Sequence, residues 1–256
     1  MRAKATLLSL ALSALFGCGS ETNQTASAET ATATTKATAA PTASAASSSK
    51  RFPLVIVDDQ GPTVDGQRSY LKKTGGLEKL AKDVAALPID GKEVPVTIEK
   101  NATIPDVVAL VKELGSKGAP TVKLTAESRG DLPKEIVVTP QSKMAGAAPP
   151  CAVVAIITEN FETDVWTIKG TTAKKGPKGF AGPDMSMAVE TLKKDLAKCD
   201  AKVAFFSADE KLPWTYAHMI AGAIRASDVE KKIEQLVLLD EVPVPGRPVK
   251  SLVEAK

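Results

Sequence analysis

Apolar residues recur along the chain with two periods, and together they predict alternating strands and helices. A short apolar run at residues 52–57 predicts a buried strand, and residues 94–98 predict another strand. Residues 121–125 alternate between polar and apolar side chains and predict the last strand of this half. Helical spacing of apolar residues over 77–87 and 104–114 predicts two amphipathic helices between those strands. Residues 58–62 are rich in Asp, Gly and Pro and predict a turn, and residues 68–72 a short second strand.

The second half of the chain repeats this order of elements. Apolar runs at residues 151–157, 165–168, 203–206 and 233–239 predict strands, and residues 184–196 and 212–226 predict helices. Leu77–Ala85 aligns with Val189–Ala197 at a spacing of 112 residues (189 minus 77), and Thr103–Pro105 aligns with Lys211–Pro213 at 108 (211 minus 103). Such a match favours an internal duplication, the alternative being chance similarity between amphipathic helices. We therefore expect an α+β fold of two tandem β-β-α-β-α-β units, each a mixed sheet with two helices packed on one face.

Composition sets the limits of these units. Residues 19–51 are mostly Ala, Thr and Ser, with no aromatic residue and no aliphatic side chain larger than Ala. Such a segment buries too little apolar surface to offset its conformational entropy, so we expect a disordered tether. The predicted order is a signal peptide at 1–18, the tether at 19–51, domain 1 at 52–143, a linker at 144–150 and domain 2 at 151–256.

The first residues are typical of a secretory leader. Arg2 and Lys4 precede an apolar stretch at residues 5–16. That stretch is shorter than the ~20 residues that span a bilayer, and it suits the apolar part of a signal peptide. Leu15-Phe16-Gly17-Cys18 resembles the bacterial lipobox. An ordinary signal peptide cut nearby, with Cys18 incidental, is the alternative.

The lipobox resemblance implies that Cys18 becomes the lipid-bearing N-terminus of the mature protein. More than one acyl chain gives stable anchoring where a single chain does not. Gly19 follows the cysteine where an Asp would retain the protein at the inner membrane. We expect a lipid-anchored protein of the bacterial cell envelope, at the outer membrane facing the periplasm or at the cell surface.

Charge excludes one class of partner. The chain has 33 Lys and Arg against 30 Asp and Glu, but two of its basic residues lie in the leader. By count, residues 52–143 carry 13 basic and 13 acidic residues, and residues 151–256 carry 15 of each. Nucleic-acid binding requires a basic surface, so it is disfavoured.

The residues around the second predicted helix of each half point to a known family. Phe206–Trp214, with Asp209 and Pro213, resembles the segment that leads into the second helix of the ExbD/TolR biopolymer-transport family. Lys100–Asp106 is a degraded version of the same segment. The resemblance implies tandem ExbD/TolR-like periplasmic domains on a lipoprotein.

One departure from that family bears on function. Its members use a transmembrane helix with an embedded Asp for proton-driven work, whereas the leader here has no Asp or Glu. The resemblance then implies a non-enzymatic binding module for an envelope protein or peptidoglycan. The two domains would pair with each other as an internal pseudo-dimer, or two copies would form a homodimer.

Two cysteines are candidates for a structural bond. Cys151 and Cys199 both lie in the second half, and an oxidising compartment favours a disulfide between them. Two separate buried thiols are the alternative. With a single histidine in the chain, we expect no metal site, and no motif suggests a cofactor.

The remaining polar candidates favour binding over catalysis. Asp209 precedes a helix that also carries Trp214 and Tyr216, so we take these three as candidate partner-binding residues, with core packing of the aromatics as the alternative. His218 suits a packing role. A lipoprotein hydrolase or small-ligand enzyme is the rival function, and it would need a cleft that joins His218 to an acid and a hydroxyl group.

Overall fold

The computed structural model describes residues 52–89, 91–128, 130, 132–144, 151–169, 172–174, 185–198 and 200–249. The predicted signal peptide and tether, with Cys18, lie outside these residues, as do Cys199 and most of the predicted linker. The described residues from Phe52 onward belong to one compact unit.

The first half contains five strands and two helices, followed by a connecting strand. In chain order they are β1 (Val55–Asp58), β2 (Gly61–Val64), β3 (Gln67–Arg68), α1 (Gly76–Ala85), β4 (Val94–Ile98), α2 (Ile104–Lys117) and β5 (Val122–Ala126). The connection consists of β6 (Glu135–Pro140) and a 3₁₀ turn, η1 (Gln141–Lys143).

The second half has the same order of elements. They are β7 (Ala152–Ile157), β8 (Thr163–Lys169), β9 (Thr172–Lys174), α3 (Met185–Lys198), β10 (Val203–Ala208), α4 (Trp214–Ser227) and β11 (Gln235–Leu238). In both halves a hairpin comes first and two parallel strands follow, each reached through a helix.

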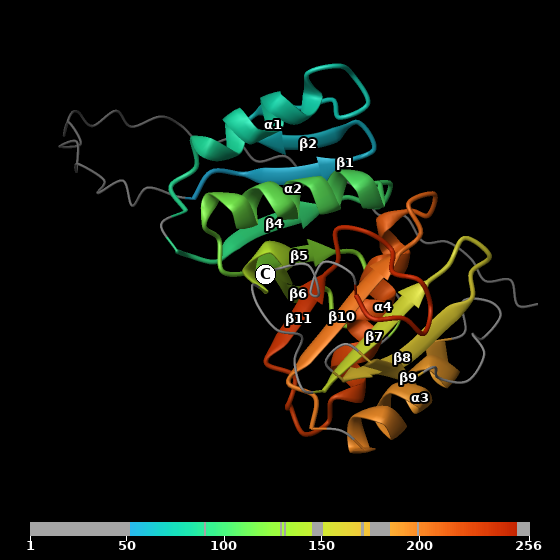
Figure 1. The fold of residues 1–256 in the computed structure, drawn as a ribbon. Helices are drawn as coiled ribbons and strands as arrows, with labels where there is room; N and C mark the ends of the chain where they lie inside the picture. Colours follow the sequence, from blue (N-terminus) through green and yellow to red (C-terminus); the bar gives the residue numbers. More distant parts are fainter. Residues whose placement is uncertain are drawn as a thin grey trace, which may run out of the picture. The chain divides into compact units, whose positions relative to one another are not determined.

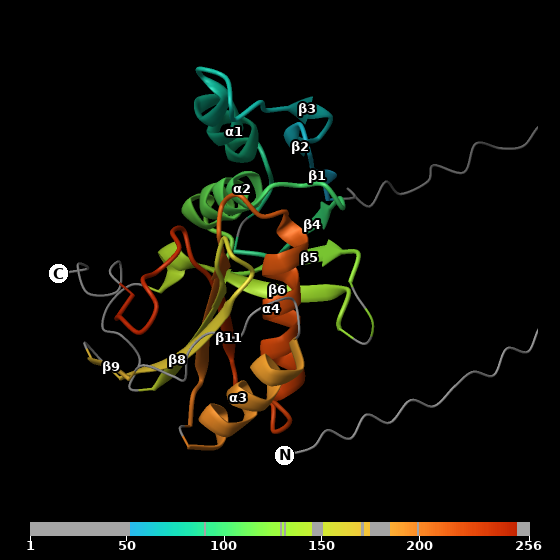
Figure 2. The same cartoon turned by 90° about the vertical axis from the view of Figure 1, so that its right-hand side faces the viewer.

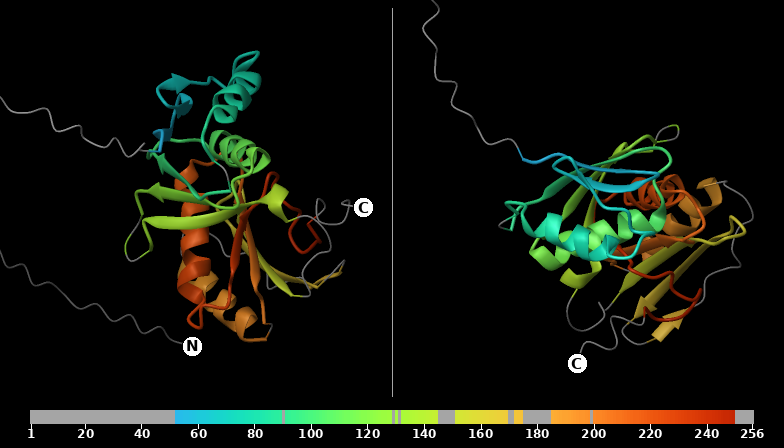
Figure 3. Two further views of the ribbon diagram at one scale, coloured as in Figure 1. Left: turned by 90° about the vertical axis from the view of Figure 1, so that its left-hand side faces the viewer. Right: turned by 90° about the horizontal axis from the view of Figure 1, so that it is seen from above.

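The mixed α/β character predicted from the sequence is confirmed. The strands of both halves, however, are hydrogen-bonded into one eleven-stranded sheet of order β3-β2-β1-β4-β5-β6-β11-β10-β7-β8-β9 among the described residues. β6 joins the halves because it pairs antiparallel with β5 and parallel with β11. The β6–β11 pairing has only two residue pairs, and the sheet turns sharply there (Figures 2 and 3).

Two strand assignments differ from the sequence prediction. Gly61 and Pro62, read as a turn, begin β2, because the hairpin turn is only Asp59-Gln60 and Asp58 pairs with Gly61. Gly61 has φ 115°, and a Cβ there would lie 2.5 Å from the Ser69 carbonyl oxygen, so only glycine fits. The predicted strand at 68–72 is wrong beyond Arg68, where β3 ends.

All four helices contribute residues to one core on one face of the sheet. Figures 1 and 2 show α1 and α2 beside the strands of the first half, and α3 and α4 beside those of the second. Leu80 of α1, Leu110 of α2, Leu192 of α3 and Ile220 of α4 belong to the same buried cluster as alternate residues of the strands. A second cluster lies on the other face, only in the second half, and includes Phe205 and Val249. This is why β7 and β10 are buried along their whole length, whereas β4 alternates between buried and exposed residues.

Helices α2 and α4 are equivalent in detail. Both have 14 residues, and α4 begins and ends 110 residues after α2 (214 minus 104, 227 minus 117). The turns before them match as well, since Ala102 N donates to Glu99 O and Leu212 N donates to Asp209 O, both at 3.0 Å. The predicted spacing of 108 is wrong by two residues, because Pro105 lies inside the first turn of α2 while Pro213 is the N-cap of α4.

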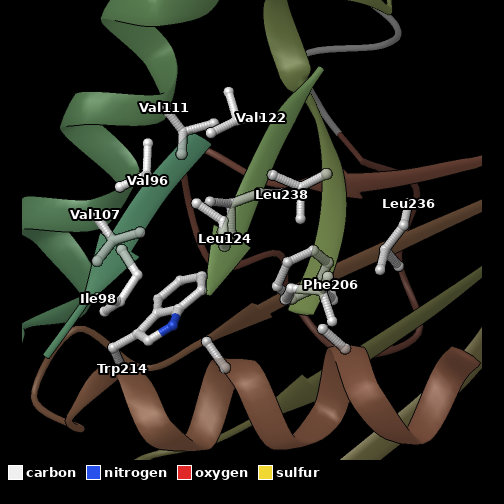
Figure 4. Close-up of a cluster of buried hydrophobic side chains, with 14 of the residues drawn as sticks. Val96, Ile98, Val107, Val111, Val122, Leu124, Phe206, Trp214, Leu236 and Leu238 are labelled. Atoms are coloured by element: carbon white, nitrogen blue, oxygen red, sulfur yellow. The ribbon is translucent and has the colours of Figure 1, made fainter. Parts of the chain in front are cut away.

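The starts of these two helices lie side by side. Thr103 and Pro213, the two N-cap residues, form an antiparallel bridge, and the Trp214 backbone N–H donates to the Ala102 carbonyl at 2.9 Å. Thr103 also caps α2, because its Oγ1 accepts from the Asp106 backbone N–H. The Trp214 ring, which is 1 % exposed, lies beside Ile98 of β4 and near Leu124 of β5 (Figure 4). The first residue of α4 is therefore packed into the first half.

Gly115 provides a test of the packing of α2 against the connection. A Cβ on Gly115 would lie 2.5 Å from Pro140 Cβ and 2.7 Å from Ser142 Oγ. We expect the steric conflict in Gly115→Ala to lower the free energy of unfolding by about 1–3 kcal/mol. The higher helix propensity of Ala offsets about 1 kcal/mol of this loss, so the net effect is destabilising.

The matched control is Ser116→Ala, because Ser116 is exposed on the same helix and gains only helix propensity. Urea unfolding followed by circular dichroism measures both variants. Equal stability changes for the two would show that α2 does not pack closely against Pro140.

Candidate functional site

The predicted site residues are not gathered at one place. Cys18 and Cys199 lie outside the described residues. Cys151 is half-buried and disulfide-bonded. Because the partner we expect for it, Cys199, is not described, the Cys151–Cys199 pairing stays a prediction.

The two candidate aromatic residues both pack against other aromatic rings. Trp214 is in the core, and its ring makes an edge contact with Phe206 at a centroid distance of 6.5 Å. Tyr216 is half-buried against Phe161, with ring centroids 5.3 Å apart. The Trp214 ring is therefore not available on the described surface, whereas Tyr216 is partly accessible.

Asp209 lies at the carboxyl end of β10 and lines a groove. Its backbone N–H donates to the Ile157 carbonyl, and its Oδ1 accepts from the Lys211 backbone N–H at 3.1 Å. These bonds hold the turn that leads to α4. The groove continues past the carboxyl end of β11, which is the edge of a parallel sheet where open α/β folds commonly bind ligands.

The groove has a volume of about 480 Å³, within the range of small-molecule pockets. One wall is the outward side of α2, and the other is formed by the turn after β10 and the residues after β11. Its apolar part consists of Leu77, Ile104, Pro105, Val108, Ala109, Ala208 and Val242. Leu77 is 50 % exposed and Val242 39 %, so apolar surface faces the opening.

The polar part of the groove is strongly acidic. Five carboxylates and one ammonium group line it: Glu113, Asp209, Glu210, Asp240, Glu241 and Lys112. Since each half of the chain is neutral by count, this is a local concentration of negative charge. A field of that sign favours cationic groups on whatever enters.

Asp240 connects this acidic lining to the junction of the halves. Its backbone N–H donates to Gln141 Oε1 at 2.6 Å, and its carboxylate lies 3.5 Å from the Lys112 ammonium. Burial raises the pKa of Asp240, an effect that Lys112 opposes. The Asp240 carboxylate is thus partly desolvated and is paired with only one cation in the lining, the exposed Lys112. An additional cation bound nearby would stabilise the charged form of Asp240.

His218 lies away from the groove. It is 1 % exposed, and its Nε2 donates to the Pro133 carbonyl at 2.9 Å, while Nδ1 has no partner among the described residues. Burial lowers the pKa of His218, against the raising effect of the Pro133 carbonyl. The packing role expected for this residue fits its position on α4.

The sequence analysis missed most of the groove. Lys112, Val108 and Asp240 were not candidates. The sequence does contain a pattern that indicates the acidic lining. The acidic pairs Asp209-Glu210 and Asp240-Glu241 each follow an apolar strand of the second half. Carboxyl ends of neighbouring parallel strands meet at one edge, so the two pairs were bound to lie close together.

The described part of the chain holds no group of three or more His, Cys, Asp and Glu side chains placed to bind a metal ion. None of its helices has the length and apolar character needed to cross a membrane.

Comparison with known proteins gives no relative: no protein-family model matches the chain, and neither does any curated protein or solved structure.

The buried histidine generates a prediction on pH. An unfolded histidine has a pKa of about 6.5, whereas the folded pKa of His218 is lower, so the unfolded state binds its proton first. The contribution to stability is complete above pH ~6.5 and is lost as the pH falls toward the folded pKa. Compared with the parent protein, His218→Gln, which keeps a donor for the Pro133 carbonyl, should lose less stability between about pH 7.5 and about pH 5.5.

Urea midpoints of both proteins at the two pH values measure this difference. Equal losses would mean that His218 titrates in the folded protein as it does in the unfolded chain.

Proposed function

We propose that this chain is a non-enzymatic, lipid-anchored protein of the bacterial envelope whose folded part binds an envelope partner. The observation that carries the proposal is the groove, because it offers exposed apolar surface and an excess of carboxylates at the carboxyl edge of a parallel sheet. The lipobox resemblance at Cys18 supports the proposed lipid anchoring in the envelope. The tether at residues 19–51 would let the folded part reach its partner at a distance from the membrane.

The tandem ExbD/TolR-like arrangement is part of this proposal. The shared element order, the equal lengths of α2 and α4, and the matching turns at Ala102 and Leu212 support an origin by duplication. β6 supports pairing of the two units within the chain, since it is hydrogen-bonded to the last parallel strand of both. In this arrangement a passive lipid takes the place of the family's proton-coupling helix.

The geometry favours binding over the rival hydrolase. That rival needs His218 beside an acid and a hydroxyl group in a cleft. His218 is absent from the groove lining and is buried against Pro133 instead. The carboxylates in the groove therefore lack the imidazole that a hydrolase of this kind would use.

The anchor is tested by lipid labelling in a bacterial host. The full chain should incorporate labelled palmitate and fractionate with membranes, whereas Cys18→Ser should do neither. Membrane recovery of Cys18→Ser equal to that of the parent would contradict lipid anchoring through this residue.

The binding function is tested with the Cys18→Ser chain as bait. Purified cell wall is sedimented with increasing amounts of the bait, and purified candidate envelope proteins are titrated with it in parallel. The proposal predicts saturable binding to one of them that excess unlabelled bait competes away. If neither yields saturable binding, the chain is not a binding module of the envelope.

Pairing of the units within the chain predicts a monomer. Light scattering of the Cys18→Ser chain during size-exclusion chromatography should give the mass of a single chain over a wide range of concentration. A stable dimer mass would favour association between copies instead.

A further inference from the structure

The outward sides of α2 and α4 are equivalent surfaces, but only one is covered by the chain. Because α4 follows α2 at a spacing of 110 residues, His218 and Gly222 of α4 correspond to Val108 and Lys112 of α2 (218 minus 108, 222 minus 112). Val108 and Lys112 both line the groove. What covers His218 and Gly222 therefore shows what the groove is shaped to accept.

An irregular backbone segment covers the surface on α4. His218 Nε2 donates to the Pro133 carbonyl, and a Cβ on Gly222 would lie 3.3 Å from Pro133 Cδ and 3.4 Å from Leu132 Cβ. This segment connects β5 to β6, and it is held by the Ser128 hydroxyl, which donates to the Leu132 carbonyl at 2.7 Å. A Leu-Pro pair of the chain itself is thus docked on α4.

The chain takes another course after β11. By the strand registers, Asp240 of the second half corresponds to Ala126 of the first, where the segment over α4 begins. After Val242 the chain continues to the opposite face of the sheet, where Val249 is buried and the Arg247 carbonyl accepts from Trp166 Nε1 at 3.0 Å. Its departure to that face leaves the α2 surface open as the groove.

We propose that the groove binds a peptide segment of a partner protein that carries an apolar residue flanked by lysine or arginine. The inference rests on the proposed binding function and names the ligand of that site. The partner's Leu-like side chain would lie against Val108 and Ala109 of α2, as Leu132 and Pro133 lie against α4. The five carboxylates against one ammonium group select for basic flanks.

Removal of Lys112 tests the proposal, because it should strengthen the binding of a basic peptide. It is the one basic residue in the described lining, it is 56 % exposed, and its ammonium lies near Asp240. Lys112→Ala removes the one ammonium group of the described lining, so a basic peptide should bind this variant more tightly by roughly two- to five-fold. The matched control is Lys100→Ala, which removes an exposed lysine outside the groove and should leave the affinity unchanged.

The probe is the labelled peptide Lys-Arg-Gly-Lys-Leu-Pro-Lys, acetylated and amidated, which is a basic form of this chain's own segment over α4. A peptide with Glu at each Lys and Arg position is the matched negative probe. Fluorescence anisotropy with the full Cys18→Ser chain measures binding at low and at physiological salt. We expect saturable binding of the basic peptide only, weaker at the higher salt.

Two groove variants locate the binding. Asp209→Asn combined with Asp240→Asn should weaken it roughly two- to five-fold per charge removed. Val108→Lys should abolish it, because it places a cation on the apolar lining. Circular dichroism shows whether each variant is folded, and Lys112→Ala, an exposed change, keeps the test open if Val108→Lys does not fold.

The results separate this inference from the proposed function. Failure of the basic peptide to bind, or affinities that no groove variant changes, would overturn the inference. If the chain then still binds cell wall or an envelope protein saturably, the proposed function stands and its site is elsewhere. Self-association that Val108→Lys abolishes, with no peptide binding, would identify a second copy of this chain as the occupant and would also overturn the inference.

Discussion

The contact between the starts of α2 and α4 is the constraint on which the rest of the arrangement depends. A single backbone hydrogen bond, from Trp214 N to Ala102 O, fixes the two helix starts beside each other. The Trp214 ring then fills space in the first half next to Ile98 and Leu124 (Figure 4). Burial of a tryptophan of this kind contributes about 3–5 kcal/mol. Strand β6 adds a second connection, because it is hydrogen-bonded to β5 of the first half and to β11 of the second. The helix starts and the sheet therefore both hold the halves together.

The two otherwise equivalent surfaces of α2 and α4 differ in what covers them. The segment after β5 turns over α4 and returns as β6, whereas the segment after β11 crosses to the other face of the sheet. One helix is closed by the chain's own Leu132 and Pro133, and the other keeps an open groove. The acidic pairs after β10 and β11 lie at the opening because the two strands are parallel neighbours. Topology alone thus brings the charge and the apolar surface together.

The sequence predicted those elements whose stability depends on interactions between residues close together in the chain. Helix α2 was predictable because Thr103 and Asp106 form its cap and its apolar residues keep helical spacing. Strand β6 was missed, since Glu135 and Pro140 at its ends are not typical of a central strand, and its position depends on partners from both halves. The groove was missed because Val108 and Asp240 are brought together by tertiary structure only. Burial of Trp214 likewise depends on β4 and β5, which lie between 88 and 120 residues earlier in the chain (214 minus 126, 214 minus 94).

The central claim is that the two halves share one core and fold as one unit. Native-state hydrogen exchange, followed by mass spectrometry at increasing denaturant, tests it most directly. Peptides from β4 and α2 and peptides from β7 and β10 should lose their protection at the same denaturant concentration, with one common free energy of opening. Loss of protection in one half while the other stays protected would contradict the account, because it would show two independent cores joined by a short strand contact.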